Sequence, residues 1–178
     1  MGPQRRLPSW KCLAFIGVLI CPTSEAADGQ ARGWIPSSGS RTQILGGTVV
    51  NGDIDGRTLE AAIEALPRRP ERIVVVETKA LPPPQESRLC DLDGFVLSDS
   101  RVIYLRRQGP TLIAAEYSGG PYVLMLAIII WHEMAHTEGL DERQAQHREE
   151  DLWKEFMRRD LMDRSLGLTY LVELQRRQ

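Results

Sequence analysis

The sequence predicts an α+β fold in which a short mixed sheet packs on a backing helix and on one buried helix, followed by an antiparallel helix. Three observations support this class. A helical repeat at 57–66 comes first, short strand-like segments follow it, and the wholly apolar stretch 123–131 comes after them. Helices and strands that are grouped along a chain, rather than alternating, are typical of α+β proteins. We expect one domain, 44–178, because this length can bury a sizeable core.

The N-terminal residues have the pattern of an export signal. Basic residues precede the apolar run Cys12–Cys21, and Ser24 and Ala26 are small residues at the positions that signal peptidases require. We therefore expect a signal peptide at 1–26 and a flexible lead-in, rich in Gly, Ser and Pro, at 27–43. The apolar run is shorter than the roughly 20 residues that span a bilayer. The expected location is periplasmic or extracellular, without stable membrane association; an uncleaved signal acting as an anchor is the alternative.

Charge and cysteine content narrow the classes of partner and of site. The formal net charge is −2 and the isoelectric point is near 6.0, so the chain lacks the basic character of nucleic-acid-binding proteins. After signal cleavage Cys90 would be the only cysteine, which excludes an internal disulfide. We expect Cys90 to be a small buried hydrophobe rather than a nucleophile. Nothing in the sequence determines the oligomeric state.

Hydrophobic spacing and helix breakers place the first elements. Apolar residues repeat at helical spacing through 57–66, and Pro67 ends that helix. The preceding loop, 51–56, superficially resembles a calcium loop, but Ala62 stands where the closing glutamate should be. We therefore expect a turn that caps the helix. Turn residues separate four expected strands: Arg72–Glu77, Gly94–Leu97, Arg101–Arg106 and Thr111–Glu116.

Two helices are expected to close the chain. The first begins with Pro121, is apolar on nearly every side, and ends at Gly139, a residue suited to a left-handed cap. The second begins at Asp141, which can form a capping box with Gln144, and extends to about Asp160. Because the connection is short, the two helices should be antiparallel neighbours.

The buried helix carries an HExxH motif at 132–136. His132 and His136 are four residues apart and lie one above the other on a helix, so both imidazoles can bind one zinc ion. Glu133 lies about 100° further round, where it can take a proton from a zinc-bound water. The alternative is a pair of core histidines with Glu133 as an ion partner. That alternative would bury a glutamate in an apolar helix without an ion or water to offset the cost.

The second helix supplies the candidates for a third ligand. One of its faces carries two acids, Glu142 and Glu149, among apolar residues, and buried acids need a partner. The tight turn after Gly139 places Glu142 close to His136, whereas Glu149 lies about 10 Å further along the axis. We expect Glu142 to bind the metal and Glu149 to serve packing or to orient a ligand, with Glu149 as the alternative ligand.

The stretch His132–Glu150 resembles the zincin metallopeptidases and looks most like compact members of their glutamate-ligand branch, the gluzincins. In that branch the third ligand is a glutamate on the next helix, often within an E-x-x-A pattern, which 142–145 matches. Gly139 and Glu142 also have the spacing of the metzincin HExxHxxGxxH pattern, with Glu in place of the third His. Both resemblances imply that Glu142 is the third ligand. Unlike gluzincins, this chain has no aspartate four residues after Glu142.

The expected function is a zinc-dependent hydrolase, a peptidase acting on peptides or proteins. Glu133 would activate a water on Zn²⁺ held by His132, His136 and Glu142. An open strand edge could bind an extended peptide, with Arg101–Arg106 and Thr111–Glu116 as candidates. The residue that stabilises the oxyanion stays open among an arginine and Tyr104, Tyr117, Tyr122 and Tyr170. The alternatives are a secreted zinc-binding protein without turnover and an interaction module with structural histidines.

Overall fold

A five-stranded mixed sheet forms one side of the molecule. The computed structural model describes residues 41–77, 92–97 and 100–176, and within them the strands lie in the order β1-β2-β3-β5-β4. The inner pairs β2/β3 and β3/β5 are parallel, and the outer pairs β1/β2 and β4/β5 are antiparallel. The strands are β1 (Thr42–Leu45), β2 (Thr48–Asn51), β3 (Arg72–Val76), β4 (Gly94–Val96) and β5 (Val102–Arg106).

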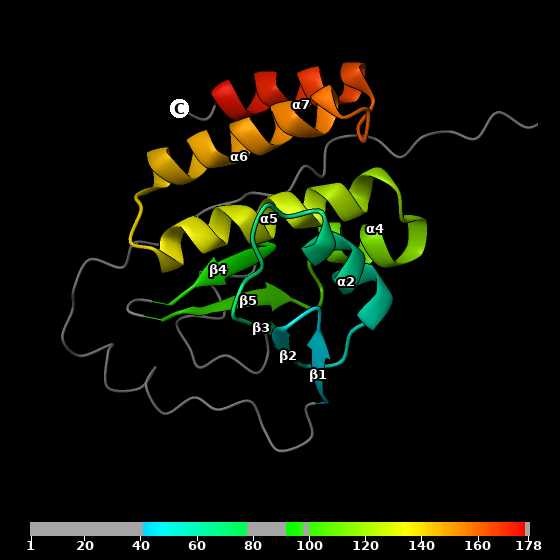
Figure 1. The fold of residues 1–178 in the computed structure, drawn as a ribbon, viewed down its shortest axis with the longest axis vertical. Coiled ribbons are helices and arrows are strands. Elements are labelled where there is room, and N and C mark those ends of the chain that lie inside the picture. Colours follow the sequence, from blue (N-terminus) through cyan, green and yellow to red (C-terminus); the bar gives the residue numbers. More distant parts are fainter. Residues whose placement is uncertain (1–40, 78–91, 98–99, 177–178) are drawn as a thin grey trace, which may run out of the picture.

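Helices stack in two further layers on this sheet. Helix α5 lies along the sheet with α2 and α4 at its N-terminal end, and α6 and α7 lie beyond α5 (Figure 1). The helices are α2 (Gly56–Glu64), α4 (Pro110–Ser118), α5 (Pro121–Thr137), α6 (Glu142–Arg158) and α7 (Arg164–Gln175). The predicted α+β class is confirmed, as are the predicted helix that backs the sheet and the antiparallel arrangement of α5 and α6 (Figure 1).

The chain enters the sheet earlier than the sequence analysis expected. Strand β1 begins at Thr42, inside the lead-in expected at 27–43, and pairs with β2 through a two-residue turn. Gly46 and Gly47 form that turn with φ of 54° and 94°, which only glycine adopts without strain. The expected signal peptide, 1–26, and Cys90 lie outside the described residues.

Two predictions about the sheet edge are wrong. The segment Thr111–Glu116 is part of helix α4, not a strand, because Pro110 at its first turn and a long-range cap favour the helix. The segment Arg101–Arg106 forms β5, which has β3 on one side and β4 on the other. In the described sheet, β4 is therefore the edge strand next to α5.

The prediction that two helices close the chain is also wrong, because α7 follows α6. After α6, Asp160 has a left-handed backbone conformation with φ of 54°, which prevents the helix from continuing. The Asp163 carboxylate then caps α7 by accepting from the Leu166 backbone N–H. Helix α7 returns antiparallel along α6, and Tyr170, Leu171 and Leu174 join the core. The Asp163 cap and the helical spacing of these apolar residues are present in the sequence. They were not recognised as a helix because α7 is short and about half exposed.

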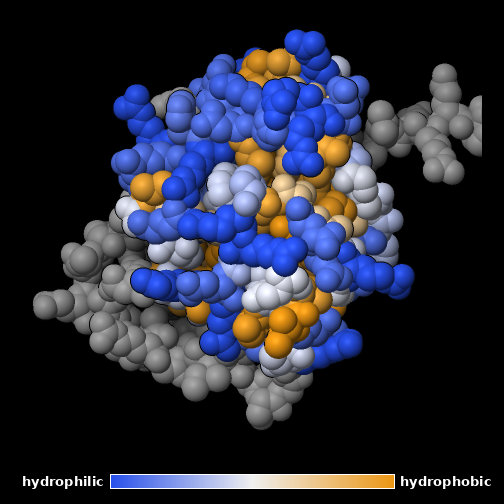
Figure 2. Space-filling model, viewed as in Figure 1, coloured by the Kyte–Doolittle hydropathy of each residue, from blue (hydrophilic) through white to orange (hydrophobic). Residues whose placement is uncertain are grey.

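The core lies around α5, and its apolar residues explain why this helix is central. Residues 126–130 of α5 are all buried, and they face the sheet, α2, α4 and α6. Figure 2 shows hydrophilic residues over the outer surface of α6, with apolar residues in the band between α6 and the sheet. Within the part of the chain that the structure describes, we find no helix both long and apolar enough to cross a membrane.

A buried carboxylate from the start of the edge strand caps helix α4. Asp93 is 3% exposed, and its two oxygens accept from the backbone N–H of Thr111 at 3.2 Å and from its hydroxyl at 2.6 Å. Burial raises the pKa of Asp93, although the hydrogen bonds from Thr111 oppose that rise. Gly109, the N-cap residue itself, has no side chain to do this. Asp93 therefore links the position of β4 to that of α4.

We expect Asp93→Ala to lower the free energy of unfolding by about 1–3 kcal/mol, because Thr111 loses both acceptors. Asp93→Asn keeps the size and one acceptor oxygen and should lose less. Urea unfolding followed by circular dichroism measures both. If Asp93→Ala unfolds at the same urea concentration as the unchanged protein, the cap contributes nothing to stability.

Candidate metal centre

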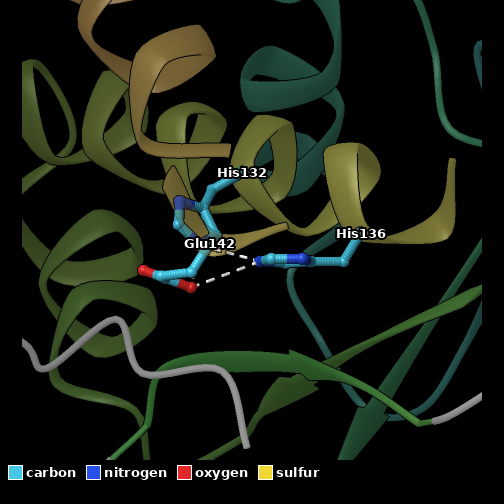
Figure 3. Close-up of side chains that lie close together, drawn as sticks. All are labelled: His132, His136 and Glu142. Carbon is cyan, nitrogen blue, oxygen red and sulfur yellow. Dashed lines mark hydrogen bonds and ion pairs between the residues drawn. The ribbon is translucent and has the colours of Figure 1, made fainter. Parts of the chain in front are cut away.

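Three side chains that the sequence analysis selected meet at the α5–α6 contact. His132 and His136 project from one face of α5, and Glu142 projects toward them from the first turn of α6 (Figure 3). The two Nε2 atoms are 3.1 Å apart, and the Glu142 Oε2 atom lies 3.5 Å from each of them. Each residue therefore presents one donor atom to the same small volume.

The spacing of these atoms fits a tetrahedral zinc ion. Zinc binds imidazole nitrogen and carboxylate oxygen at about 2.0–2.2 Å, and two ligands at the tetrahedral angle are then about 3.3–3.6 Å apart. The three edges of the observed triangle, 3.1, 3.5 and 3.5 Å, lie close to that range. Two histidines and a carboxylate are also a donor set that zinc accepts, with a fourth position left open in catalytic sites.

The Nδ1 atoms of both rings, the outer nitrogens, are hydrogen-bonded. This orients the Nε2 atoms, the inner nitrogens, toward the position that a cation would take. The His136 Nδ1 atom lies 2.9 Å from the Leu140 carbonyl oxygen, which can only accept, so this nitrogen carries the proton. The His132 Nδ1 atom lies 2.9 Å from the Glu149 carboxylate, which accepts in the same way. In the neutral rings both Nε2 lone pairs therefore point at one another. Two lone pairs 3.1 Å apart repel unless a proton or a metal ion lies between them.

The charges of the cluster also favour a cation. Burial opposes the charged form of His132, but contacts with Glu142 and Glu149 outweigh it and raise the pKa of His132 to about 10. Partial burial likewise opposes the charged form of Glu142, but contacts with His132 and His136 lower its pKa to about 2. The cluster thus stabilises positive charge among its carboxylates, and metal binding there would have to release a proton.

Glu133 lies beside this cluster and is completely buried. Its side chain has 0% exposure, and neither carboxylate oxygen has a hydrogen-bond partner among the described residues. Burial raises the pKa of Glu133 to about 7, although His132 and His136 oppose the rise. A buried carboxylate without a hydrogen bond is costly, so Glu133 lowers the stability of the metal-free protein.

The edge strand passes close to Glu133. A Cβ atom added at Gly94 would lie 3.3 Å from the Glu133 Cγ atom and 3.0 Å from the Ile129 Cγ2 atom. A side chain at this position would push Ile129 and Glu133 away by a few tenths of an ångström, so glycine favours the close approach of β4 to α5. The backbone of the edge strand is therefore next to the proposed base.

The structure separates the two acidic candidates that the sequence left open. Glu142 contacts the inner nitrogens of both histidines, whereas Glu149 lies behind His132, on its Nδ1 atom. Glu149 is completely buried, and its other oxygen accepts a hydrogen bond from the Tyr170 hydroxyl of α7. His147, the remaining histidine, is exposed on α6.

Sequence reasoning missed two contacts at this site. The Leu140 carbonyl orients His136, and its only sequence signal is the short turn that brings residue 140 back over the helix end. Tyr170 was considered for the oxyanion, but its hydroxyl is bonded to Glu149. Of the other tyrosines considered, Tyr117 is 86% exposed on α4, and Tyr104 stacks on Phe95 of the edge strand with ring centroids 5.2 Å apart.

Comparison with known proteins identifies no relative. No protein-family model matches the chain, no curated protein is significantly similar to it, and no solved structure matches its fold. The residues of the site therefore carry the functional argument.

Proposed function

We propose that the protein is a zinc-dependent hydrolase of the zincin kind, a peptidase, with His132, His136 and Glu142 as the metal ligands and Glu133 as the general base. The observation that carries this proposal is the triangle of donor atoms, with edges of 3.1, 3.5 and 3.5 Å. Both histidines also direct Nε2 into that triangle while Nδ1 is bonded to an acceptor outside it, which is the orientation that metal-binding histidines need.

Zinc bound at these residues would lower the pKa of a coordinated water to about 7 and would polarise a substrate carbonyl. His132 and His136 would hold the ion from α5, and Glu142 would supply the negative ligand from α6. Glu133, one residue after the first ligand, would accept the proton of the water and pass it to the leaving amine. The closely packed helix holds these groups in fixed positions, as general acid–base catalysis requires.

The edge strand supports a peptide as the substrate. An extended peptide can add to the edge strand of a sheet by main-chain hydrogen bonds, and among the described residues β4 is the edge strand next to α5, with Gly94 beside Glu133. Strand β4 therefore replaces Arg101–Arg106 and Thr111–Glu116, the segments that the sequence suggested as the peptide-binding edge.

A zinc-binding protein without turnover is the second candidate. The observation that favours it is the complete burial of Glu133, because a base has to reach the water and the substrate. The interaction module with structural histidines is less well supported, since it gives no role to the buried Glu133 carboxylate, whose oxygens have no hydrogen-bond partner among the described residues.

We expect purified protein to bind close to one zinc per chain, and any hydrolysis of synthetic peptides to stop when a chelator removes the metal. Metal analysis after dialysis, followed by assays before and after re-addition of zinc, measures both. Zinc without hydrolysis across a broad peptide mixture would support the second candidate. Absence of bound zinc after incubation with the metal would contradict both.

A further inference from the structure

A buried chain of hydrogen bonds links the C-terminal helix to the metal centre. The Tyr170 hydroxyl of α7 donates to one oxygen of Glu149, and the other oxygen of Glu149 accepts from the His132 Nδ1 atom at 2.9 Å. Glu149 and His132 have 0% exposure, and Tyr170 has 7%. The chain thus joins α7, α6 and α5 without access to bulk water.

Each member of this chain has a defined direction of donation. An ionised Glu149 only accepts, so it binds both the tyrosine O–H and the imidazole N–H. With Nδ1–H held by Glu149, the Nε2 atom of His132 faces the cluster formed with His136 and Glu142, and a metal ion would bind there in place of any Nε2 proton. Glu149 therefore selects the tautomer that can bind metal, and Tyr170 holds Glu149 in place.

The packing around Tyr170 leaves its ring little freedom. The ring lies 4.3 Å from the ring of Trp153, which itself is buried against Phe156. Gly167, one turn earlier on α7, packs against Met157 of α6, since a Cβ there would lie 2.4 Å from the Met157 sulfur atom. The hydroxyl is therefore delivered to Glu149 by the docking of α7 on α6.

We propose that Tyr170 is a positioning residue of the metal centre, which makes the docking of α7 and the binding of metal at His132 mutually dependent. This inference rests on the proposed zinc site and extends it to a helix that contributes no ligand. A cation on the His132 Nε2 atom makes the Nδ1–H a stronger donor, which strengthens the bond to Glu149. Thermodynamic linkage requires the coupling to be reciprocal. If the docked α7 increases the metal affinity, bound metal stabilises the docking of α7 by the same free energy.

Tyr170→Phe is the central test, because it removes the hydroxyl and keeps the ring that packs on Trp153. We expect its zinc affinity, measured by competition with a chelator, to fall about 10-fold, the lower end of the range for outer partners of metal ligands. Glu149→Gln, which weakens the acceptor for His132, should lose more. In the zinc-loaded protein, the low-field nitrogen-bound proton signal of His132 should move upfield in Tyr170→Phe and exchange faster with water.

Leu174→Ala is the matched control for a merely structural role of α7. Leu174 is 2% exposed in the same helix, so this variant loses stability through lost packing while its Tyr170 hydroxyl remains. We expect its zinc affinity to stay within about twofold of the unchanged protein at a temperature where amide exchange shows that α7 stays docked in both. Zinc should also slow amide hydrogen exchange in α7 of the unchanged protein more than in Tyr170→Phe.

The outcomes separate this inference from the proposed function. If the unchanged protein binds zinc and Tyr170→Phe binds it equally tightly with an unchanged His132 signal, the positioning role is wrong and the zinc site stands. If Leu174→Ala loses as much affinity as Tyr170→Phe, the role of α7 is only structural and the inference is overturned. If the unchanged protein binds no zinc, both proposals fail.

Discussion

Replacing Glu133 with glutamine should leave zinc binding and folding intact and should lower peptide turnover by about 10²–10⁴-fold, the range over which general bases contribute. The amide has the same shape but cannot accept the proton of the attacking water. It is also neutral, so it costs less to bury than a carboxylate without a hydrogen-bond partner, and the free energy of unfolding should not decrease. Metal analysis, urea unfolding and a peptide cleavage assay measure the three quantities.

Glu138→Gln provides a matched control on the same helix. Glu138 stands at the end of α5 and pairs on the surface with Arg68 and Arg148, away from the histidine nitrogens. The same chemical change there should alter turnover by less than about twofold, because surface ion pairs contribute little. Full turnover in Glu133→Gln would remove Glu133 as the base, whatever the metal content.

The second large effect is a difference between two glutamates of α6, one of which should affect mainly zinc affinity and the other mainly stability. Glu142→Ala removes the proposed third ligand, whose side chain is 34% exposed, so zinc affinity should fall by more than the about 10–100-fold that outer partners contribute, with little loss of stability. Glu149→Ala leaves His132 and Tyr170 without their buried acceptor. It should lower the free energy of unfolding by about 1–3 kcal/mol for each lost partner, and zinc affinity by less than Glu142→Ala does.

Chelator competition measures the zinc affinity of the two variants, and urea unfolding of the metal-free variants measures their stability. The two substitutions make the same chemical change on one helix, so each is the control for the other. If Glu149→Ala loses zinc and Glu142→Ala retains it, the ligand assignment is reversed and Glu149 is the third ligand.

Elements that depend on neighbours in the sequence were predictable. The helix at 57–66, the capping box of Asp141 and Gln144, and the helix end at Gly139 all rest on contacts within a few residues, and all are confirmed. Asp55 caps α2 by accepting from the Arg57 backbone N–H, which confirms a capping turn in the loop once compared with a calcium site. Capping and helical spacing act between residues close in the sequence, so these elements can be predicted without knowledge of the tertiary contacts.

Elements that depend on distant partners were missed or misread. The apolar run at 111–116 suits a strand or a helix equally, and the Asp93 carboxylate from another strand caps it as a helix. The hairpin of β1 and β2 is short on its own and gains its stability by pairing with β3. Likewise, the order of strands, which makes β4 and not β5 the edge, follows from crossovers that no local pattern contains.

The sequence by itself determined that His132 and His136 share one face of a buried helix with Glu133 beside them, because four-residue spacing and helix geometry require it. It also narrowed the third position to two acids on one face of α6. Only the tertiary structure decided which acid meets which nitrogen. The packing of α6 on α5 brings Glu142 to within 3.5 Å of both Nε2 atoms, and it places Glu149 on the Nδ1 atom of His132. The angle between two helices is set by the side chains that interlock between them and by the third helix behind them, so the position of Tyr170 could not be found from the sequence of α7 alone.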